Sequence, residues 1–184
     1  MPDAANISEQ NIIECIASAR LWTIHISPYS AKMQTIADRY AIAASLLSTI
    51  TGLAAWGTIA ASPRLWAQVL VGLMAFAAAA VAVIPKVIGY SDCAVKAAPL
   101  SAEYGKVLGK LLNAQDELLS GNSNAQADSK EAIEEFDQIR ARKQALKPFP
   151  TDVLNVVDQE RPAAIEKEQK AVAARKAELQ ARAA

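Results

Sequence analysis

The chain has 184 residues, and its 19 basic and 19 acidic side chains give a formal net charge of zero. A general electrostatic attraction to nucleic acid or to anionic lipid is therefore not expected. Hydrophobic residues make up 52% of the chain but are unevenly spread, since residues 40–85 contain one charged residue, Arg64, while residues 126–184 are rich in charge. That contrast argues against a single globular core.

The start of the chain predicts cytoplasmic helices over residues 1–40. Apolar residues recur at helical spacing from residue 7 to 26, and Ser27–Pro28 is expected to interrupt the helix before a second one runs through residues 31–40. The early residues are polar and acidic, so no signal peptide is expected. The one histidine, His25, is expected to be packed among apolar neighbours, with a pH-sensing or ligand-contacting role as the alternative.

Two uncharged apolar segments follow, at about residues 41–62 and 65–85. Each has the roughly 20 residues that a helix needs to cross a hydrocarbon core. The link between them contains Pro63 and Arg64 and is so short that the two helices must form an antiparallel hairpin over residues 41–86. The alternative is a pair of buried helices in a soluble all-α domain, but no other part of the chain is apolar enough to cover them.

The positions of the basic residues predict the orientation of this hairpin. Arg64 is the one basic residue in the connecting turn, whereas seven flank the opposite ends of the spans: Arg20, Lys32, Arg39, Lys86, Lys96, Lys106 and Lys110. Basic residues are enriched on the cytoplasmic side of membrane helices. We therefore expect a multi-pass protein of the bacterial inner (cell) membrane with both termini in the cytoplasm.

Small and hydroxyl-bearing residues follow one side of each span. They are Ser45, Ser48, Thr49 and Gly52 in the first span, and Gly72, Ala75, Ala79 and Ala82 in the second. These stripes either pack the hairpin and its neighbours, or line a water-filled path. Two helices cannot enclose a pore, so the second interpretation requires several copies. Because neither span contains Asp or Glu, an intramembrane proton relay is not expected.

A cytoplasmic helical hairpin is predicted over residues 87–147. An apolar stripe that includes Leu100, Tyr104 and Leu111 leads to a turn at residues 120–124, and the next helix is expected from about Asp128 to Leu146, with Glu131 in a capping box. The basic residues near its end, Arg140, Arg142 and Lys143, either complement the helix dipole or bind an anionic ligand.

Residues 148–184 are predicted to form a proline-bounded linker and a charged helical tail. Residues 147–152 should break the preceding helix, and Pro162 should end a short helix that follows. Ile165, Val172 and Leu179 recur every seven residues, so the tail either packs in an oligomer or is a solvated helix. No convincing strand pattern occurs, and the predicted class is all-α.

The sequence gives little support for catalysis. One histidine and two cysteines, Cys15 and Cys93, make a metal cluster or a Ser–His site hard to build, and no glycine-rich phosphate loop is present. The cysteines are too few for a disulfide framework and are expected to be reduced thiols. We expect a protein that is not an enzyme and has no metal or other cofactor.

The overall plan resembles that of SLATT-domain proteins. The resemblance covers residues 7–147 and rests on an N-terminal helix with Trp22, the basic pair Lys32 and Arg39, two closely linked spans and a helical cytoplasmic half. It implies a two-span effector of bacterial anti-phage systems that answers an oligonucleotide or cyclic-nucleotide signal from a companion nucleotidyltransferase. It also implies assembly into a homo-oligomer, such as a tetramer, that disrupts the membrane and arrests growth.

The leading hypothesis is therefore a ligand-gated homo-oligomeric pore in the lipid bilayer, with the hydroxyl stripe lining the path and Arg140, Arg142 and Lys143 sensing the ligand. A second hypothesis is a membrane scaffold that docks a soluble partner through its charged tail. A third is a regulatory subunit of a larger membrane complex.

Overall fold

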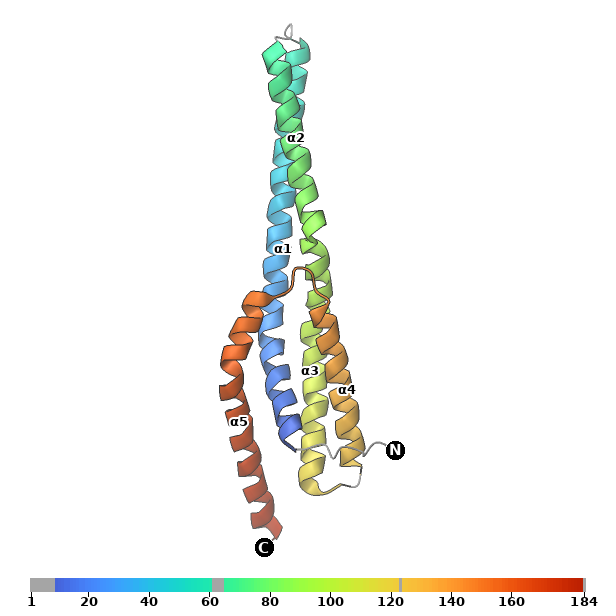
Figure 1. The fold of residues 1–184 in the computed structure, drawn as a ribbon, viewed down its shortest axis with the longest axis vertical. Coiled ribbons are helices and arrows are strands. Elements are labelled where there is room, and N and C mark those ends of the chain that lie inside the picture. Colours follow the sequence, from blue (N-terminus) through green and yellow to red (C-terminus); the bar gives the residue numbers. More distant parts are fainter. Residues whose placement is uncertain (1–8, 61–64, 123, 184) are drawn as a thin grey trace. The chain divides into compact units, whose positions relative to one another are not determined.

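The structure is a computed structural model that describes residues 9–60, 65–122 and 124–183. These residues form the helices α1 (Glu9–Ala60), α2 (Leu65–Ile88), α3 (Tyr90–Ser120), α4 (Ala125–Gln144) and α5 (Thr151–Ala183), with no strand among them (Figure 1). The all-α prediction is confirmed. The chain divides into a hairpin unit, residues 30–95, and a helical unit, which comprises the described residues up to Tyr29 and from Lys96 onward.

The helices α1 and α3 each contribute to both units. The predicted domain boundary at residue 40 lies inside α1, and the boundary at residue 86 lies inside the last turn of α2. The junction between α2 and α3 is a single residue, Gly89, with φ of 79°, a left-handed conformation that glycine adopts without steric cost.

The predicted helix breaks at Pro28 and Pro162 are wrong, because α1 and α5 run through them. A proline removes one helical hydrogen bond, but buried neighbours can hold the flanking turns in place. Ile26 is fully buried and Tyr29 is nearly so, on either side of Pro28. In the turn before this proline, the Ser101 hydroxyl donates a hydrogen bond of 3.2 Å to the Thr23 carbonyl.

The hairpin unit presents apolar side chains outward. Two stretches of helix, one in α1 and one beginning with α2, are long and apolar enough to cross a membrane. Within α2 the buried residue is Ala78, whereas Leu65, Phe76 and Val87 are 75–81% exposed. A soluble monomer rarely exposes so large an apolar surface. The connecting turn with Pro63 and Arg64 lies outside the described residues.

Two contacts define one end of the hairpin unit. The rings of Tyr40 and Tyr90 stack with centroids 6.2 Å apart, and the Ser30 hydroxyl donates to the Ala94 carbonyl at 3.1 Å. Both tyrosines lie next to the ends of the apolar segments, where amphipathic rings are common in membrane proteins.

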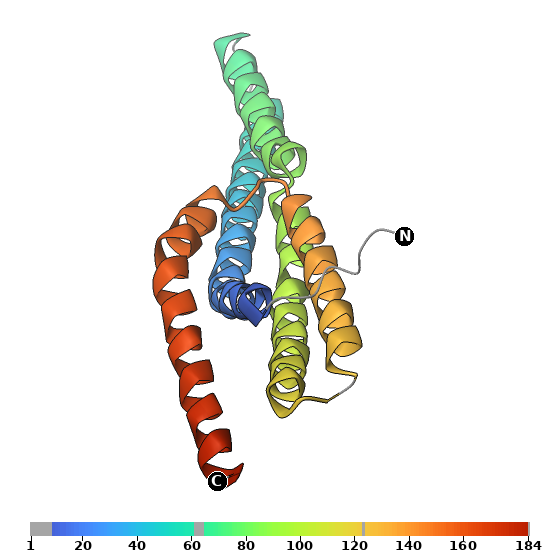
Figure 2. The same ribbon diagram turned by 60° about the horizontal axis from the view of Figure 1, so that its bottom comes forward.

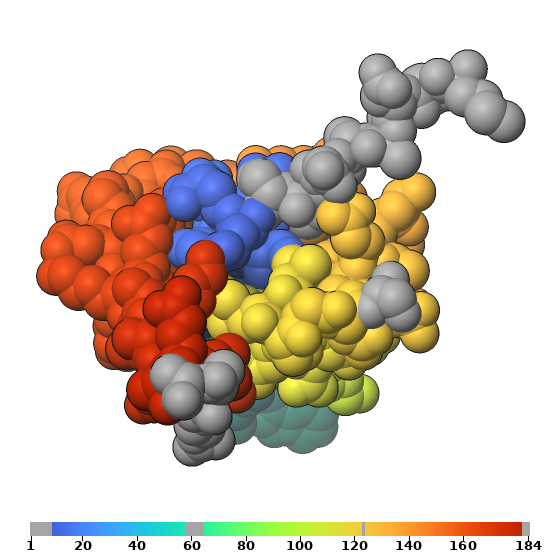
Figure 3. Space-filling model, turned by 90° about the horizontal axis from the view of Figure 1, so that it is seen from below, coloured from blue at the N-terminus to red at the C-terminus, as the bar shows by residue number. Residues whose placement is uncertain are grey.

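The helical unit has its own core, to which all four of its helical segments contribute. In Figures 1 and 2, α3 lies beside α4, and α5 lies beside the first part of α1. Seen from below, the start of α1 is surrounded by α5 and by the α3–α4 pair (Figure 3). About half of the predicted apolar stripe of α3 is buried, namely Leu100, Tyr104, Val107 and Leu111, whereas Leu108, Leu112, Leu118 and Leu119 are half-buried. Phe136 and Ile139 of α4 and Leu146, just after it, are also buried.

The ends of α4 differ from the prediction. The helix begins at Ala125 rather than near Asp128, and its N-cap residue, Asn124, makes no side-chain capping hydrogen bond. The predicted capping box with Glu131 is therefore wrong; the Glu131 carboxylate instead lies 3.5 Å from Lys110 Nζ. The predicted break at residues 147–152 is confirmed, since α4 ends at Gln144 and α5 begins at Thr151.

The tail helix α5 packs within its own chain, mainly through polar contacts. Val157 and Val172 are its buried apolar residues. Ion pairs connect it to α1 and α3: Glu9–Lys176, Glu14–Arg161, Arg20–Glu168, His25–Glu160 and Asp116–Arg175. The expectation of a packed apolar His25 is wrong, because this half-buried side chain lies 2.9 Å from the Glu160 carboxylate.

Arg20→Ala is expected to loosen α5. The Glu168 side chain is 8% exposed and its nearest cation is Arg20, 3.3 Å away, so the substitution leaves a buried carboxylate unpaired. The cost should be about 1–2 kcal/mol. Thermal unfolding and tryptic cleavage within α5 measure it. Lys130→Ala, which removes an exposed pair with Glu134, is the control and should cost less than about 0.5 kcal/mol. Equal effects of the two substitutions would contradict the prediction.

Candidate functional site

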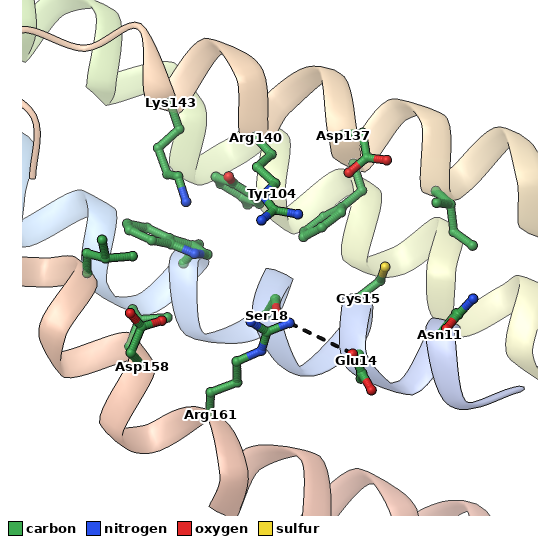
Figure 4. A pocket seen from close by; sticks show the side chains of 15 residues that line it. Asn11, Glu14, Cys15, Ser18, Tyr104, Asp137, Arg140, Lys143, Asp158 and Arg161 are labelled. Atoms are coloured by element: carbon green, nitrogen blue, oxygen red, sulfur yellow. Dashed lines mark ion pairs between the residues drawn. The ribbon is translucent and has the colours of Figure 1, made fainter. Parts of the chain in front are cut away.

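A cavity of about 270 Å³ lies in the helical unit, with walls from all four of its helical segments (Figure 4). Its walls combine apolar residues with three acidic and three basic side chains. The charged residues are Glu14 from α1, Asp137, Arg140 and Lys143 from α4, and Asp158 and Arg161 from α5. Of these six, Lys143 is buried, Glu14 and Arg161 are half-buried, and Asp137, Arg140 and Asp158 are exposed. Burial of a charge such as that of Lys143 is costly unless it is paired or meets a ligand.

Three aromatic rings form a continuous wall of the cavity. Trp22 and Tyr104 stack with centroids 6.4 Å apart, and Phe136 meets Tyr104 edge-on at 6.0 Å. The Tyr104 side chain is fully buried, and its hydroxyl has no hydrogen-bond partner among the described residues. Burial raises the pKa of this phenol, so it stays protonated and can donate a hydrogen bond.

Lys143 is the least exposed cation of the cavity. It is 5% exposed, and its Nζ lies 3.4 Å from the centroid of the Trp22 ring, with no carboxylate of the described residues in ion-pair range. Burial, together with the nearby charges of Arg140 and Arg161, lowers the pKa of Lys143 to about 8, against the opposing effect of Asp158. The contact with the Trp22 face stabilises the cation in part.

The opposite end of the cavity is acidic. There the Cys15 thiol lies near Glu14, Asp137 and Asn11 (Figure 4). Burial, together with the carboxylates of Asp137 and Glu14, raises the pKa of this thiol to about 11, so it stays protonated and is a poor nucleophile. Arg161 lies 3.9 Å from Glu14 and only partly offsets this charge.

The predicted ligand-contacting residues separate into two groups. Arg140 and Lys143 line the cavity, whereas Arg142 points elsewhere and makes two contacts of 2.7 and 2.9 Å with the Glu103 carboxylate. The sequence pattern did not identify Tyr104, Asp158 or Arg161 as neighbours of this cluster. The sequence predicts an interruption at Pro162, whereas α5 continues through it. The sequence therefore did not indicate which residues of α5 face α4.

Only some of the small residues predicted to form stripes in the hairpin unit line a common groove. Ser48 and Gly52 line a shallow groove between α1 and α2, opposite Ala75, Ala79 and Ala82. Ser45 and Thr49 lie on the exposed surface, where the Thr49 hydroxyl donates to the Ser45 carbonyl at 2.9 Å. Gly72 does not line the groove, and a Cβ added there would meet no atom within 4 Å.

No family model, curated protein or solved structure matches this chain. Within the described ranges, no group of three or more His, Cys, Asp or Glu side chains is arranged to hold a metal ion. Cys15 and Cys93 are not joined in a disulfide bond. The candidate sites are thus the cavity of the helical unit and the groove of the hairpin unit.

The buried Lys143 predicts a specific pH dependence of stability. Its pKa is about 8 in the folded chain and 10.5 ordinarily, so the unfolded chain binds more protons between these values. Stability contributed by this group should therefore rise with pH from about 8 to about 10.5. Charged and titratable groups that face it are Arg140 on α4, Asp158 and Arg161 on α5, and Tyr104 on α3.

The measurement compares the unfolding of the native chain with that of Lys143→Met across this pH range. The native chain should gain about 1 kcal/mol relative to the variant, less than the full shift implies because solvent and the Trp22 ring screen the charge. Parallel pH profiles would show that Lys143 titrates normally.

Proposed function

We propose that this chain is a membrane effector that assembles into a homo-oligomeric pore gated by a cytoplasmic, nucleotide-type signal. Opening would disrupt the membrane and arrest growth, which is the role that the resemblance to SLATT-domain effectors of anti-phage systems implies. Both termini would lie in the cytoplasm of a bacterial cell, with the helical unit as the sensor and the hairpin unit in the inner membrane.

The observation that carries this proposal is the surface of the hairpin unit. Large apolar side chains such as Trp56, Leu65 and Phe76 are more than 70% exposed, so this surface needs lipid around it. Between them lies the groove of small residues, including Ser48 and Gly52. Small residues let helix backbones approach closely, and lipid chains fill such a groove poorly.

The same groove supports the proposed assembly of several copies. A second copy seated along it would bring polar hydroxyls of α1 toward the centre of a multimer, and two helices per chain are too few to enclose a path. Ser45 and Thr49, exposed beside the groove, are the hydroxyl-bearing residues that would then face water.

The cavity supports the gating part of the proposal. It holds cations that are not paired with carboxylates within the described residues, Arg140 and Lys143, as a receptor for an anionic signal requires. The helix α1 is continuous from cavity residues such as Cys15 to the apolar segment. A shift of α1 on ligand binding would therefore be transmitted along the same helix to the hairpin unit.

The alternative scaffold role has less support. It needs a charged tail with free side chains for a soluble partner, but many charged residues of α5 are engaged within the chain, among them Glu160, Arg161, Glu168, Arg175 and Lys176. The pore hypothesis instead relies on the exposed apolar residues and the groove of the hairpin unit.

The experiment expresses the chain in bacteria loaded with a voltage-sensitive dye, with and without a companion nucleotidyltransferase. Depolarisation and growth arrest that depend on the signal are expected. The proposal fails if neither adding nor removing the signal changes membrane potential. Preserved arrest after deletion of residues 162–184, which keeps every residue that lines the cavity, would also exclude the scaffold role, which requires the charged tail.

A further inference from the structure

We infer that the cavity of the helical unit binds a small bipolar molecule, with an anionic group against Lys143 and Tyr104 and a cationic or hydrogen-bond-donating group against Asp137 and Glu14. This inference rests on the proposed role of the cavity as the signal-binding site, and it specifies the chemistry of the ligand.

At the basic end, no carboxylate of the described residues lies in ion-pair range of Lys143; Asp158 lines this side of the cavity but is outside that range. Lys143 Nζ has the Trp22 ring as its partner, and Arg140 makes no ion pair with a described carboxylate. The buried Tyr104 hydroxyl has no hydrogen-bond partner either, and in Figure 4 its ring lies between Lys143 and Arg140. The buried Lys143 ammonium and the buried Tyr104 phenol are donors with no acceptor among the described residues, and the exposed Arg140 guanidinium lies beside them. A carboxylate or phosphate group satisfies such an arrangement.

At the other end, carboxylates outnumber cations. The carboxylates of Glu14 and Asp137 lie near Asn11 and Cys15, and Arg161 pairs with Glu14 at 3.9 Å but leaves Asp137 unpaired among the described residues. A ligand that is anionic throughout would be repelled here. An amino group would be attracted, because a carboxylate accepts hydrogen bonds and favours positive charge.

The size of the cavity limits the ligand. Its volume, about 270 Å³, lies just below the range of roughly 300–1,000 Å³ for pockets that take drug-sized molecules. The part of a ligand that lies inside the cavity is therefore about the size of a single nucleotide unit or smaller. A longer oligonucleotide would place one unit in the cavity and extend beyond it.

Apolar and aromatic walls join the two ends. Trp22 and Phe136 contribute ring surface, and Leu154 and Val157 of α5 close the opposite side. A flexible methylene chain or a flat ring fits between them. The cavity thus selects for two polar ends separated by an apolar middle.

The test measures binding of defined probes to the detergent-solubilised full chain by calorimetry. Inorganic phosphate and hexanoate carry the anionic end alone, whereas 6-aminohexanoate and adenosine monophosphate add an amino group. Each bipolar probe should bind about tenfold or more tightly than its monopolar counterpart. The two bipolar probes distinguish an amino-acid-like source from a nucleotide source of the same chemistry.

Substitutions locate the two ends. Lys143→Met and Tyr104→Phe should each weaken all four probes about five- to tenfold, whereas Asp137→Asn should remove the advantage of the bipolar probes without weakening phosphate. Arg142→Met is the matched control, because this side chain contacts Glu103 outside the cavity, and it should leave binding unchanged.

The inference is overturned if no probe binds below about 10 mM, if bipolar and monopolar probes bind alike, or if Lys143→Met binds as the native chain does. Flux of dye from liposomes tests the proposed function separately. Binding without gating would refute the pore hypothesis but support the inferred ligand chemistry. Gating that is unaffected by substitution of Lys143 and Tyr104 would support the pore hypothesis but refute the inferred binding site.

Discussion

Leucine in place of Gly52 is expected to prevent assembly and abolish ion flux while the single chain stays folded. A Cβ at this position meets no atom within 4 Å in the chain, so the substitution creates no internal clash at that atom. The added side chain instead fills the groove formed with Ala75, Ala79 and Ala82, which a second copy is proposed to occupy. Close helix contact requires small residues, and bulky ones prevent it.

Cross-linking in membranes and dye release from liposomes measure this result. Gly57→Leu is the matched control: it makes the same change on the same helix, also in open space, but Gly57 does not line the groove. We expect the control to assemble and the groove variant to lose at least about tenfold of the flux, as expected for the loss of a close helix–helix contact. If the two variants behave alike, the groove is not the assembly surface.

The two apolar helices of the hairpin unit were predictable because their length and composition are those of helices that can cross a membrane. One charged residue, Arg64, in residues 40–85 and two runs of about 20 apolar residues indicate two spans without knowledge of any contact. The small-residue positions at Ser48, Gly52 and Ala79 also follow from helical spacing, and the structure brings them together in one groove. Which hydroxyls lie beside that groove was not readable, because Ser45 and Ser48 differ by less than one turn.

The cavity was predictable only in part, because it depends on contacts between residues far apart in the chain. Helical spacing predicts that Arg140 and Lys143 lie near one another on α4. It does not show that Arg142 lies on another side of this helix and pairs with Glu103. The sequence did not predict that α5 continues through Pro162, because a proline removes a helical hydrogen bond and usually breaks a helix. Its ion pairs with α1, such as Arg161 with Glu14, hold the helix in a register that a sequence pattern does not display.

Tyr104→Ala is expected to be the most destabilising single substitution in the helical unit. The ring is fully buried between Trp22 and Phe136, with centroids 6.4 and 6.0 Å away. Removing it deletes both aromatic contacts and enlarges an existing cavity, for which about 3–5 kcal/mol is typical. Tyr104→Phe should leave the free energy of unfolding unchanged or raise it, because it keeps the ring and removes a buried hydroxyl that has no hydrogen-bond partner among the described residues.

The two substitutions are best compared in a chain whose fluorescence reports on the helical unit alone. The protein has three tryptophans, and Trp56 and Trp66 lie in the hairpin unit, so replacing both with phenylalanine leaves Trp22 beside the Tyr104 ring. In this background the alanine variant should unfold early, and the phenylalanine variant should match the parent or exceed it by up to about 1 kcal/mol. A phenylalanine variant less stable than its parent would mean that the hydroxyl has a structural partner. Equal or greater stability, combined with weaker binding of anionic probes, would mean that the hydroxyl is kept for a ligand.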